Sequence, residues 1–143
     1  MIPTDFLFQL AEYEGIKIEW ANLTNIKGLY LHTPTLKSPV IALAHSLHNN
    51  ERKLRCVLAH ELGHHFKTAG HHTIAANYLN SVYATKNELS ATKWAVNFLV
   101  DTEIFLECIN DQRNAWDLSD YFYVTKDFID FKWNLLKEME GIL

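Results

Sequence analysis

The stretch His60-Glu61-Leu62-Gly63-His64 is the most informative part of this 143-residue chain. Residues four positions apart lie on one face of an α-helix, so the imidazoles of His60 and His64 can both reach one metal ion. Glu61 lies beside them and can take a proton from a water in the remaining coordination position. The stretch predicts a metal-dependent hydrolase, with His60 and His64 as metal ligands and Glu61 as the catalytic base.

The residues around this stretch predict one long helix. Asn49 or Asn50 can cap its start, and Glu51 suits its first turn. Apolar residues then recur at helical spacing through Lys67: Leu54, Val57, Leu58, Leu62 and Phe66. The motif therefore falls in the middle of a helix. The alternative is a core helix that carries two hydrogen-bonded histidines and no metal.

A catalytic zinc site needs a third protein ligand. The downstream candidates are His71, His72, Glu88, Asp101 and Glu103. The metzincin spacing requires Gly three residues and His six residues after the second His, and these positions hold Lys67 and Gly70. That pattern is therefore excluded. His71 and His72 follow the glycine that marks the helix end, so they would have to bind from a loop.

Glu88 is placed to act as a ligand from a second helix. Three small or apolar residues follow it on one helical face: Ala91, Ala95 and Leu99. The alanines, with Gly63 opposite, would let the two helices approach closely, and the Glu88 carboxylate would complete a His-His-Glu site. Thr85 and Glu88 also match a capping box, in which Glu88 only bonds the backbone at the helix start. The spacing leaves both interpretations open.

Two blocks of this sequence resemble the ImmA/IrrE family of metallo-endopeptidases. The first block is Leu58-Ala59-His60-Glu61-Leu62-Gly63-His64-His65, and the second is Glu88-Leu89-Ser90-Ala91-Thr92-Lys93-Trp94-Ala95-Val96-Asn97-Phe98-Leu99-Val100. In that family the second block begins with the glutamate that is the third metal ligand, and Glu88 matches this position. Three residues depart from the family's Asn, Met and Pro: Thr92, Val100 and Asp101.

The resemblance implies a zincin-like metallo-endopeptidase with a gluzincin-like ligand set of His60, His64 and Glu88. Zinc is the expected metal, and manganese is an alternative because His and carboxylate ligands accept both. Family members often accompany phages or mobile elements and cleave a helix-turn-helix repressor, so the implied substrate is a transcriptional repressor. Two other functions stay open: a metal-containing regulatory binding module with little turnover, and a toxin-like protein with an antitoxin partner.

The remaining pattern predicts an α+β fold in a single domain spanning residues 1–143. We expect a helix over 4–14, three short strands over 16–20, 28–32 and 40–44, and later helices over 115–122 and 126–139. The small sheet of about three strands should pack on the active-site helix and further helices. An edge of this sheet near 40–44 would bind the substrate by strand addition.

Charge and composition limit the partners. A net charge of −4 argues against direct nucleic-acid binding, which is built from clustered Lys and Arg. The chain has no long apolar run and no basic N-terminal leader, so we expect no membrane span and a cytoplasmic protein. Cys56 and Cys108 lack metal-binding spacing and are expected to be reduced core residues.

The residue that stabilises the oxyanion is left undecided. Four candidates lie between the two ligand blocks: His71, His72, Tyr78 and Tyr83. The substrate's cleavage site and the oligomeric state are also left open.

Overall fold

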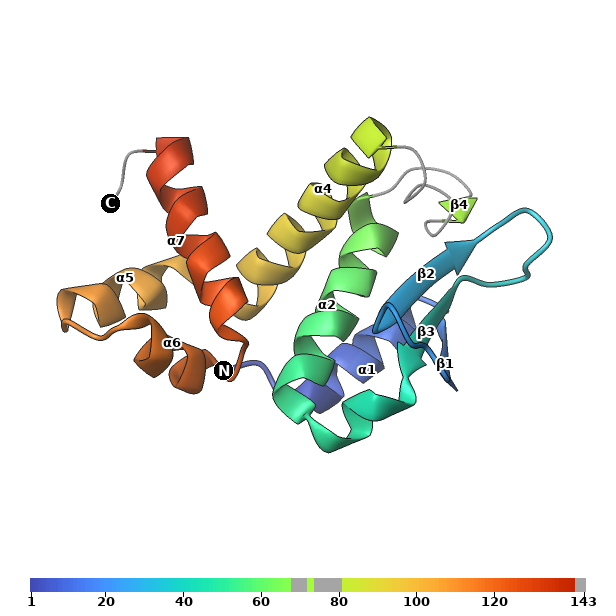
Figure 1. Cartoon of the computed structure of the whole chain (residues 1–143), viewed down its shortest axis with the longest axis horizontal. Helices are drawn as coiled ribbons and strands as arrows, with labels where there is room; N and C mark the ends of the chain where they lie inside the picture. Colours follow the sequence, from blue (N-terminus) through green and yellow to red (C-terminus); the bar gives the residue numbers. More distant parts are fainter. Residues whose placement is uncertain (68–71, 74–80, 141–143) are drawn as a thin grey trace.

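The computed structural model describes residues 1–67, 72–73 and 81–140, and these form an α+β fold (Figure 1). Its first half contains α1 (Thr4–Tyr13), β1 (Lys17–Ala21), β2 (Gly28–His32), β3 (Val40–Ala44) and the 3-10 helix η1 (His45–Asn49). The second half contains α2 (Glu51–Lys67), β4 (His72–Thr73), α4 (Ser81–Leu99), α5 (Thr102–Asn110), α6 (Ala115–Phe122) and α7 (Lys126–Glu140). The predicted fold class is confirmed.

The sheet has the strand order β1-β3-β2-β4. β1 pairs with β3 in parallel, β2 pairs with β3 in antiparallel, and β4 bonds only to the end of β2, at Leu31 and His32. The three predicted strands are confirmed, although β1 begins one residue later than expected, and the two-residue β4 was not predicted. The predicted open edge near 40–44 is wrong, because β3 lies between two strands.

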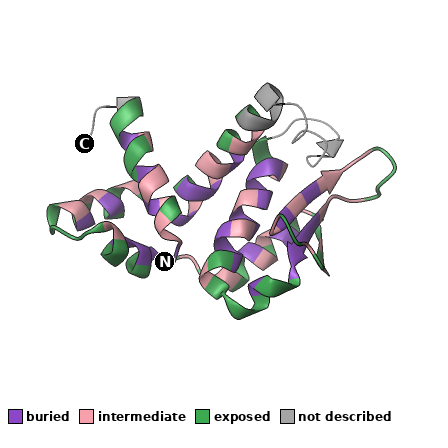
Figure 2. Ribbon diagram, viewed as in Figure 1, coloured by how far each residue is buried: buried purple, intermediate pink, exposed green. Residues whose placement is uncertain are grey.

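Helix α2 is the centre of the structure, with the sheet on one side and α4 on the other (Figure 1). The buried surfaces of α2 and α4 face each other (Figure 2). A Cβ atom on Gly63 of α2 would collide with the carbonyl oxygen of Ala91 and lie 2.9 Å from its Cα atom. The two helix backbones are therefore in direct contact, as the small residues predicted.

The C-terminal helices extend from the end of α4. Asp101 caps α5, where its Oδ2 atom accepts a hydrogen bond from the backbone N–H of Ile104 at 3.0 Å. Lys132 of α7 is buried and donates to Asn97 Oδ1 at 3.0 Å and to Thr102 Oγ1 at 2.8 Å. These bonds tie α7 to α4 and α5.

Two further sequence predictions concern the core and the membrane. Cys56 and Cys108 are both buried and free, as predicted. None of the helices in the described ranges combines the length and apolar character needed to cross a bilayer.

Candidate metal centre

Helices α2 and α4 bring His60, His64 and Glu88 together. One ligand atom from each of the three side chains lies within 4.8 Å of the others. Glu88 Oε2 is 2.5 Å from His60 Nε2 and 3.1 Å from His64 Nε2. His64 is fully buried, whereas His60 and Glu88 are partly exposed, so the cluster opens to one side. Among the residues that the structure describes, no other trio of potential ligands is this close.

The start of helix α4 excludes one of the two interpretations of Glu88. Helix α4 begins at Ser81, so both Thr85 and Glu88 lie inside it rather than at its start. The capping-box interpretation is therefore wrong. The Glu88 side chain instead reaches across to both histidines of α2.

His60 is held in place by a residue from the facing helix. The Oγ1 atom of Thr92 lies 3.0 Å from His60 Nδ1, one helical turn beyond Glu88. When Nδ1–H donates to this hydroxyl, the lone pair of Nε2 points toward Glu88 and is free to bind a cation. The sequence identified Thr92 only as a departure from the family pattern. No local sequence pattern marks this role, because it depends on where the facing helix lies.

His65, the residue after His64, holds α2 against β2 and the end of α1. The hydroxyl of Tyr30 lies 2.8 Å from His65 Nδ1, and His65 Nε2 lies 3.0 Å from Glu14 Oε1. His65 thus links α2 to β2 and to the end of α1. These contacts restrict rotation of α2 and so help to orient His64.

Glu61 is a buried carboxylate beside the cluster. It is 4% exposed, and its Oε1 atom has no hydrogen-bond partner within the described part of the chain. Burial raises the pKa of Glu61 to about 7; the positive charge of His60 opposes this rise and the negative charge of Glu88 adds to it. A pKa near neutrality suits a general base.

Strand β2 closes over this carboxylate. A Cβ atom on Gly28 would lie 2.8 Å from Glu61 Oε2 and 2.6 Å from Val57 Cγ1. Both distances are shorter than real Cβ contacts, so a side chain at this position would displace Glu61. Glycine at the first residue of β2 therefore allows the strand to pack closely against Glu61 and Val57 of α2.

The residues in the cluster fit a divalent metal ion. Burial lowers the pKa of His60, but the hydrogen bond to Glu88 and the charges of Glu61 and Glu88 outweigh this effect and raise it. Two carboxylates thus make the surroundings of the imidazoles negative, which favours a cation. Two imidazole nitrogens and one carboxylate oxygen form a donor set that zinc accepts. The assignment of these three residues as ligands stays a prediction.

The other candidate ligands lie elsewhere or cannot be placed. Asp101 is engaged as the cap of α5, and Glu103 is exposed on that helix. His72 is in β4, and its side chain, like that of Tyr83 in α4, is outside the described part of the structure. His71 and Tyr78 lie outside the described residues altogether. The four oxyanion candidates therefore stay predictions.

Comparison with known proteins identifies the family. A family model described as the IrrE N-terminal-like domain, from a peptidase family, matches residues 11–134. The match covers both ligand blocks and most of the chain, so the chain belongs to this family. Comparison with curated proteins gave no match.

Proposed function

We propose that this member of the IrrE N-terminal-like peptidase family is a metal-dependent endopeptidase that hydrolyses a peptide bond in a protein. The observation that carries the proposal is the arrangement of two helices. They place two imidazoles and a carboxylate around one point. Beside this point lies the buried carboxylate of Glu61, whose Oε1 atom has no hydrogen-bond partner among the described residues.

In this proposal His60, His64 and Glu88 hold zinc, or manganese where it is the available metal. When bound, the metal supplies Lewis acidity, which polarises the scissile carbonyl and makes water more acidic. Thr92 keeps Nε2 of His60 directed at the site. Glu61, whose carboxylate lies beside His60, accepts the proton of the attacking water and then delivers it to the amine that leaves.

Because β3 lies between two strands, we propose that the substrate adds to the open edge of β2 instead. In the described ranges, β4 pairs with the last two residues of β2, and no strand pairs with the outer side of residues 28–30. Gly28, at the start of this open edge, lies against Glu61. An extended peptide bonded to this edge would bring its backbone to the metal centre.

The proposed substrate is a helix-turn-helix repressor of a phage or mobile element. A repressor that is cleaved in the cell interior requires a cytoplasmic enzyme, and the acidic net charge of the chain favours a protein substrate over direct contact with DNA. The competing function is a metal-containing binding module. It has no need for a buried general base, which is why we favour the endopeptidase.

The test uses the protein purified without added metal, analysed for its metal content and then loaded with zinc. We expect it to cleave the repressor encoded by a neighbouring gene, and we expect Glu61→Gln to keep the metal and lose turnover. Glu103→Gln, an exposed glutamate on α5, is the matched control and should cleave normally. Cleavage by Glu61→Gln at the wild-type rate would refute the base. Tight repressor binding without cleavage would support the binding module.

A further inference from the structure

A pocket opens beside the metal centre, on the side of α2 that faces β2 and the start of α7. It has a volume of about 370 Å³ and shares His60 and Glu61 with the metal centre. Its other walls come from the segment before β2, from α2 one turn before His60, and from residues 125–128. The start of α7 thus contributes directly to the wall of this pocket.

The inner surface of the pocket is apolar. Its apolar or small lining residues are Ile26, Gly28, Cys56, Val57 and Phe128. Among the charged residues, Lys27 donates to Ser46 Oγ at 3.0 Å, while Lys53 and Asp127 are exposed and opposite in charge. Lys27 and Lys53 carry two positive charges and Asp127 and Glu61 two negative ones, so the lining as a whole favours neither sign of charge. A basic side chain would pair with Glu61 and remove the base, and an acidic one would be repelled by it.

The α7 wall is tied to α2 by the turn between α6 and α7. The backbone N–H of Thr125 donates to Cys56 Sγ at 3.4 Å, and Arg52 donates to Asp120 Oδ1 at 2.9 Å. Tyr123, which makes the turn with a φ of 54°, packs its ring 5.0 Å from the guanidinium carbon of Arg52. The wall is therefore held in position before substrate arrives, as selectivity requires.

We infer that this pocket is a substrate subsite that binds the side chain next to the scissile bond and selects apolar side chains of leucine to phenylalanine size. The inference rests on the proposed endopeptidase function. Val57 and Phe128, which face the pocket from α2 and α7, set the size of the accepted side chain.

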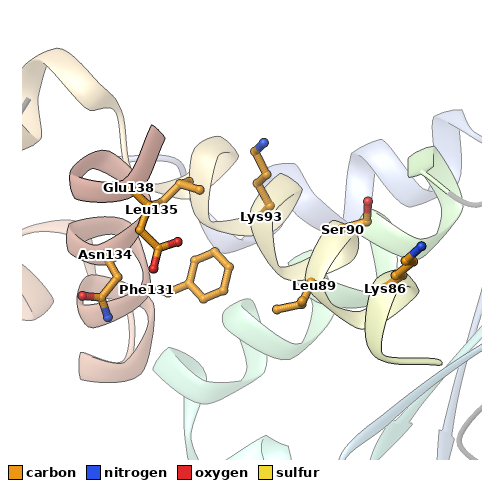
Figure 3. Close-up of a pocket in the computed structure, with 8 residues that line it drawn as sticks. All are labelled: Lys86, Leu89, Ser90, Lys93, Phe131, Asn134, Leu135 and Glu138. Atoms are coloured by element: carbon orange, nitrogen blue, oxygen red, sulfur yellow. The ribbon is translucent and has the colours of Figure 1, made fainter. Parts of the chain in front are cut away.

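A second pocket provides a site for a control variant. It lies between α4 and α7, where Leu89 and Phe131 line it, and it contains none of the metal-centre residues (Figure 3). Leu89 is on a different face of α4 from Glu88 and is 54% exposed. Leu89→Phe therefore enlarges an apolar side chain on the same fold without touching the proposed subsite.

The first experiment digests a mixture of proteome-derived peptides with the zinc-loaded protein and maps the cleavage sites by mass spectrometry. We expect a preference for Leu, Met or Phe at one position beside the cleaved bond. Val57→Phe should shift kcat/KM toward Ala and Gly by at least roughly 10- to 200-fold, the range for a single methylene in an apolar pocket. Phe128→Ala should admit Trp, and Leu89→Phe should leave the profile unchanged.

The second experiment measures the selectivity of the subsite by ligand binding, so it does not depend on peptide cleavage. Calorimetry measures binding of glycine, leucine and lysine hydroxamates to the same zinc-loaded proteins. We expect wild type to bind leucine hydroxamate at least about tenfold more tightly than the other two, and we expect Val57→Phe to lose this difference. Thermal unfolding of each variant confirms that it is folded.

The outcomes separate the two proposals. Selective hydroxamate binding without any peptide cleavage would support the subsite and contradict the endopeptidase. Cleavage with the same profile in wild type, Val57→Phe and Phe128→Ala, together with equal hydroxamate affinities, would overturn the subsite and leave the endopeptidase standing. A preference for charged side chains at this position would also overturn the subsite proposal.

Discussion

At the scale of single residues, Glu61 shows how catalytic chemistry conflicts with stability. Its carboxylate is removed from water and lies near a second carboxylate, Glu88. Both effects destabilise its charged form, which is the form a base requires. A bound cation would relieve this cost, so the metal-free protein should carry the penalty and the metal-loaded protein should not.

Glu61→Gln should therefore stabilise the metal-free protein in a pH-dependent way. The pKa of Glu61 is about 7 in the folded state against an ordinary value of 4.5, so its contribution is fully present below 4.5 and is lost as the pH rises through 7. Above neutrality the variant should be more stable than wild type by up to about 3 kcal/mol, and near pH 4.5 the two should be equal. Urea unfolding of chelated protein measures this. The same gain at every pH would contradict it.

Thr92 and Glu88 allow the metal centre to be dissected. Thr92→Val removes the hydroxyl 3.0 Å from His60 Nδ1 while keeping the side-chain shape, and we expect roughly a 10- to 100-fold loss of zinc affinity. Glu88→Gln removes a charged ligand atom and should cost considerably more. Competition with a chelator of known affinity measures both. Full occupancy of Glu88→Gln at limiting zinc would exclude Glu88 as a ligand.

These residues differ in how far the sequence alone brings them to one place. His60, Glu61 and His64 follow from local helix geometry, so their spacing alone indicates that they share a site. Glu88 depends on where a second helix begins, and the local Thr85–Glu88 pair imitates a helix start. The role of Thr92 depends on the facing helix, and no local pattern within α4 shows that contact.

At the scale of elements, the contact between α2 and α4 determines whether the ligands meet. Gly63→Ala would place a Cβ against backbone atoms of Ala91, which cannot rotate away. The helices would have to separate, and we expect about 1–3 kcal/mol of destabilisation despite alanine's better helix propensity. Zinc affinity should fall as well, because Glu88 moves with α4.

Gly15→Ala is the matched control for this variant. Gly15 has a φ of +73°, and a Cβ added there would have no neighbouring atom within 4 Å, so alanine strains the backbone without moving α2 or α4. It should lower stability and leave zinc affinity unchanged. Urea unfolding and zinc titration of both variants make the comparison. Unchanged zinc affinity in a destabilised Gly63→Ala would show that the ligands tolerate separation of the helices.

The elements themselves were predicted where the signal was local. Helix α2 has a capping Asn50, whose Oδ1 accepts from the Lys53 N–H, and a regular apolar stripe. Helix α5 was missed because it is short and because its cap, Asp101, was considered only as a ligand. The central place of β3 could not be predicted, because the parallel pairing of β1 with β3 joins segments that are distant in sequence.

At the scale of the whole molecule, the proposed catalytic cleft is assembled from parts far apart in the chain. The sheet covers Glu61 through Gly28, α4 supplies Glu88 and Thr92, and the start of α7 adds a wall. The start of α7 is thus part of this proposed cleft. The sequence predicted helices over 115–122 and 126–139 but not their approach to α2, which depends on contacts between residues distant in sequence.

The pH dependence of hydrolysis tests this assembly as one unit. Protons compete with metal for His60, whose pKa is raised, and a protonated Glu61 cannot act as the base. Activity should therefore rise from acid pH toward neutrality. Excess zinc should restore only the part lost through metal dissociation. Because a bound cation favours the ionised form of Glu61, the midpoint at saturating zinc should lie below 7.

Removal of the metal by a chelator tests whether cleavage depends on it at all. Removing the metal should abolish cleavage at every pH, and adding zinc back should restore it, since the ligands belong to a folded framework tied by α1, β2 and α4. Rates are measured on the repressor, with elemental analysis of each sample. Cleavage that persists in protein verified to be free of metal would count against the whole hydrolytic mechanism, because Glu61 alone has no means of polarising the scissile carbonyl.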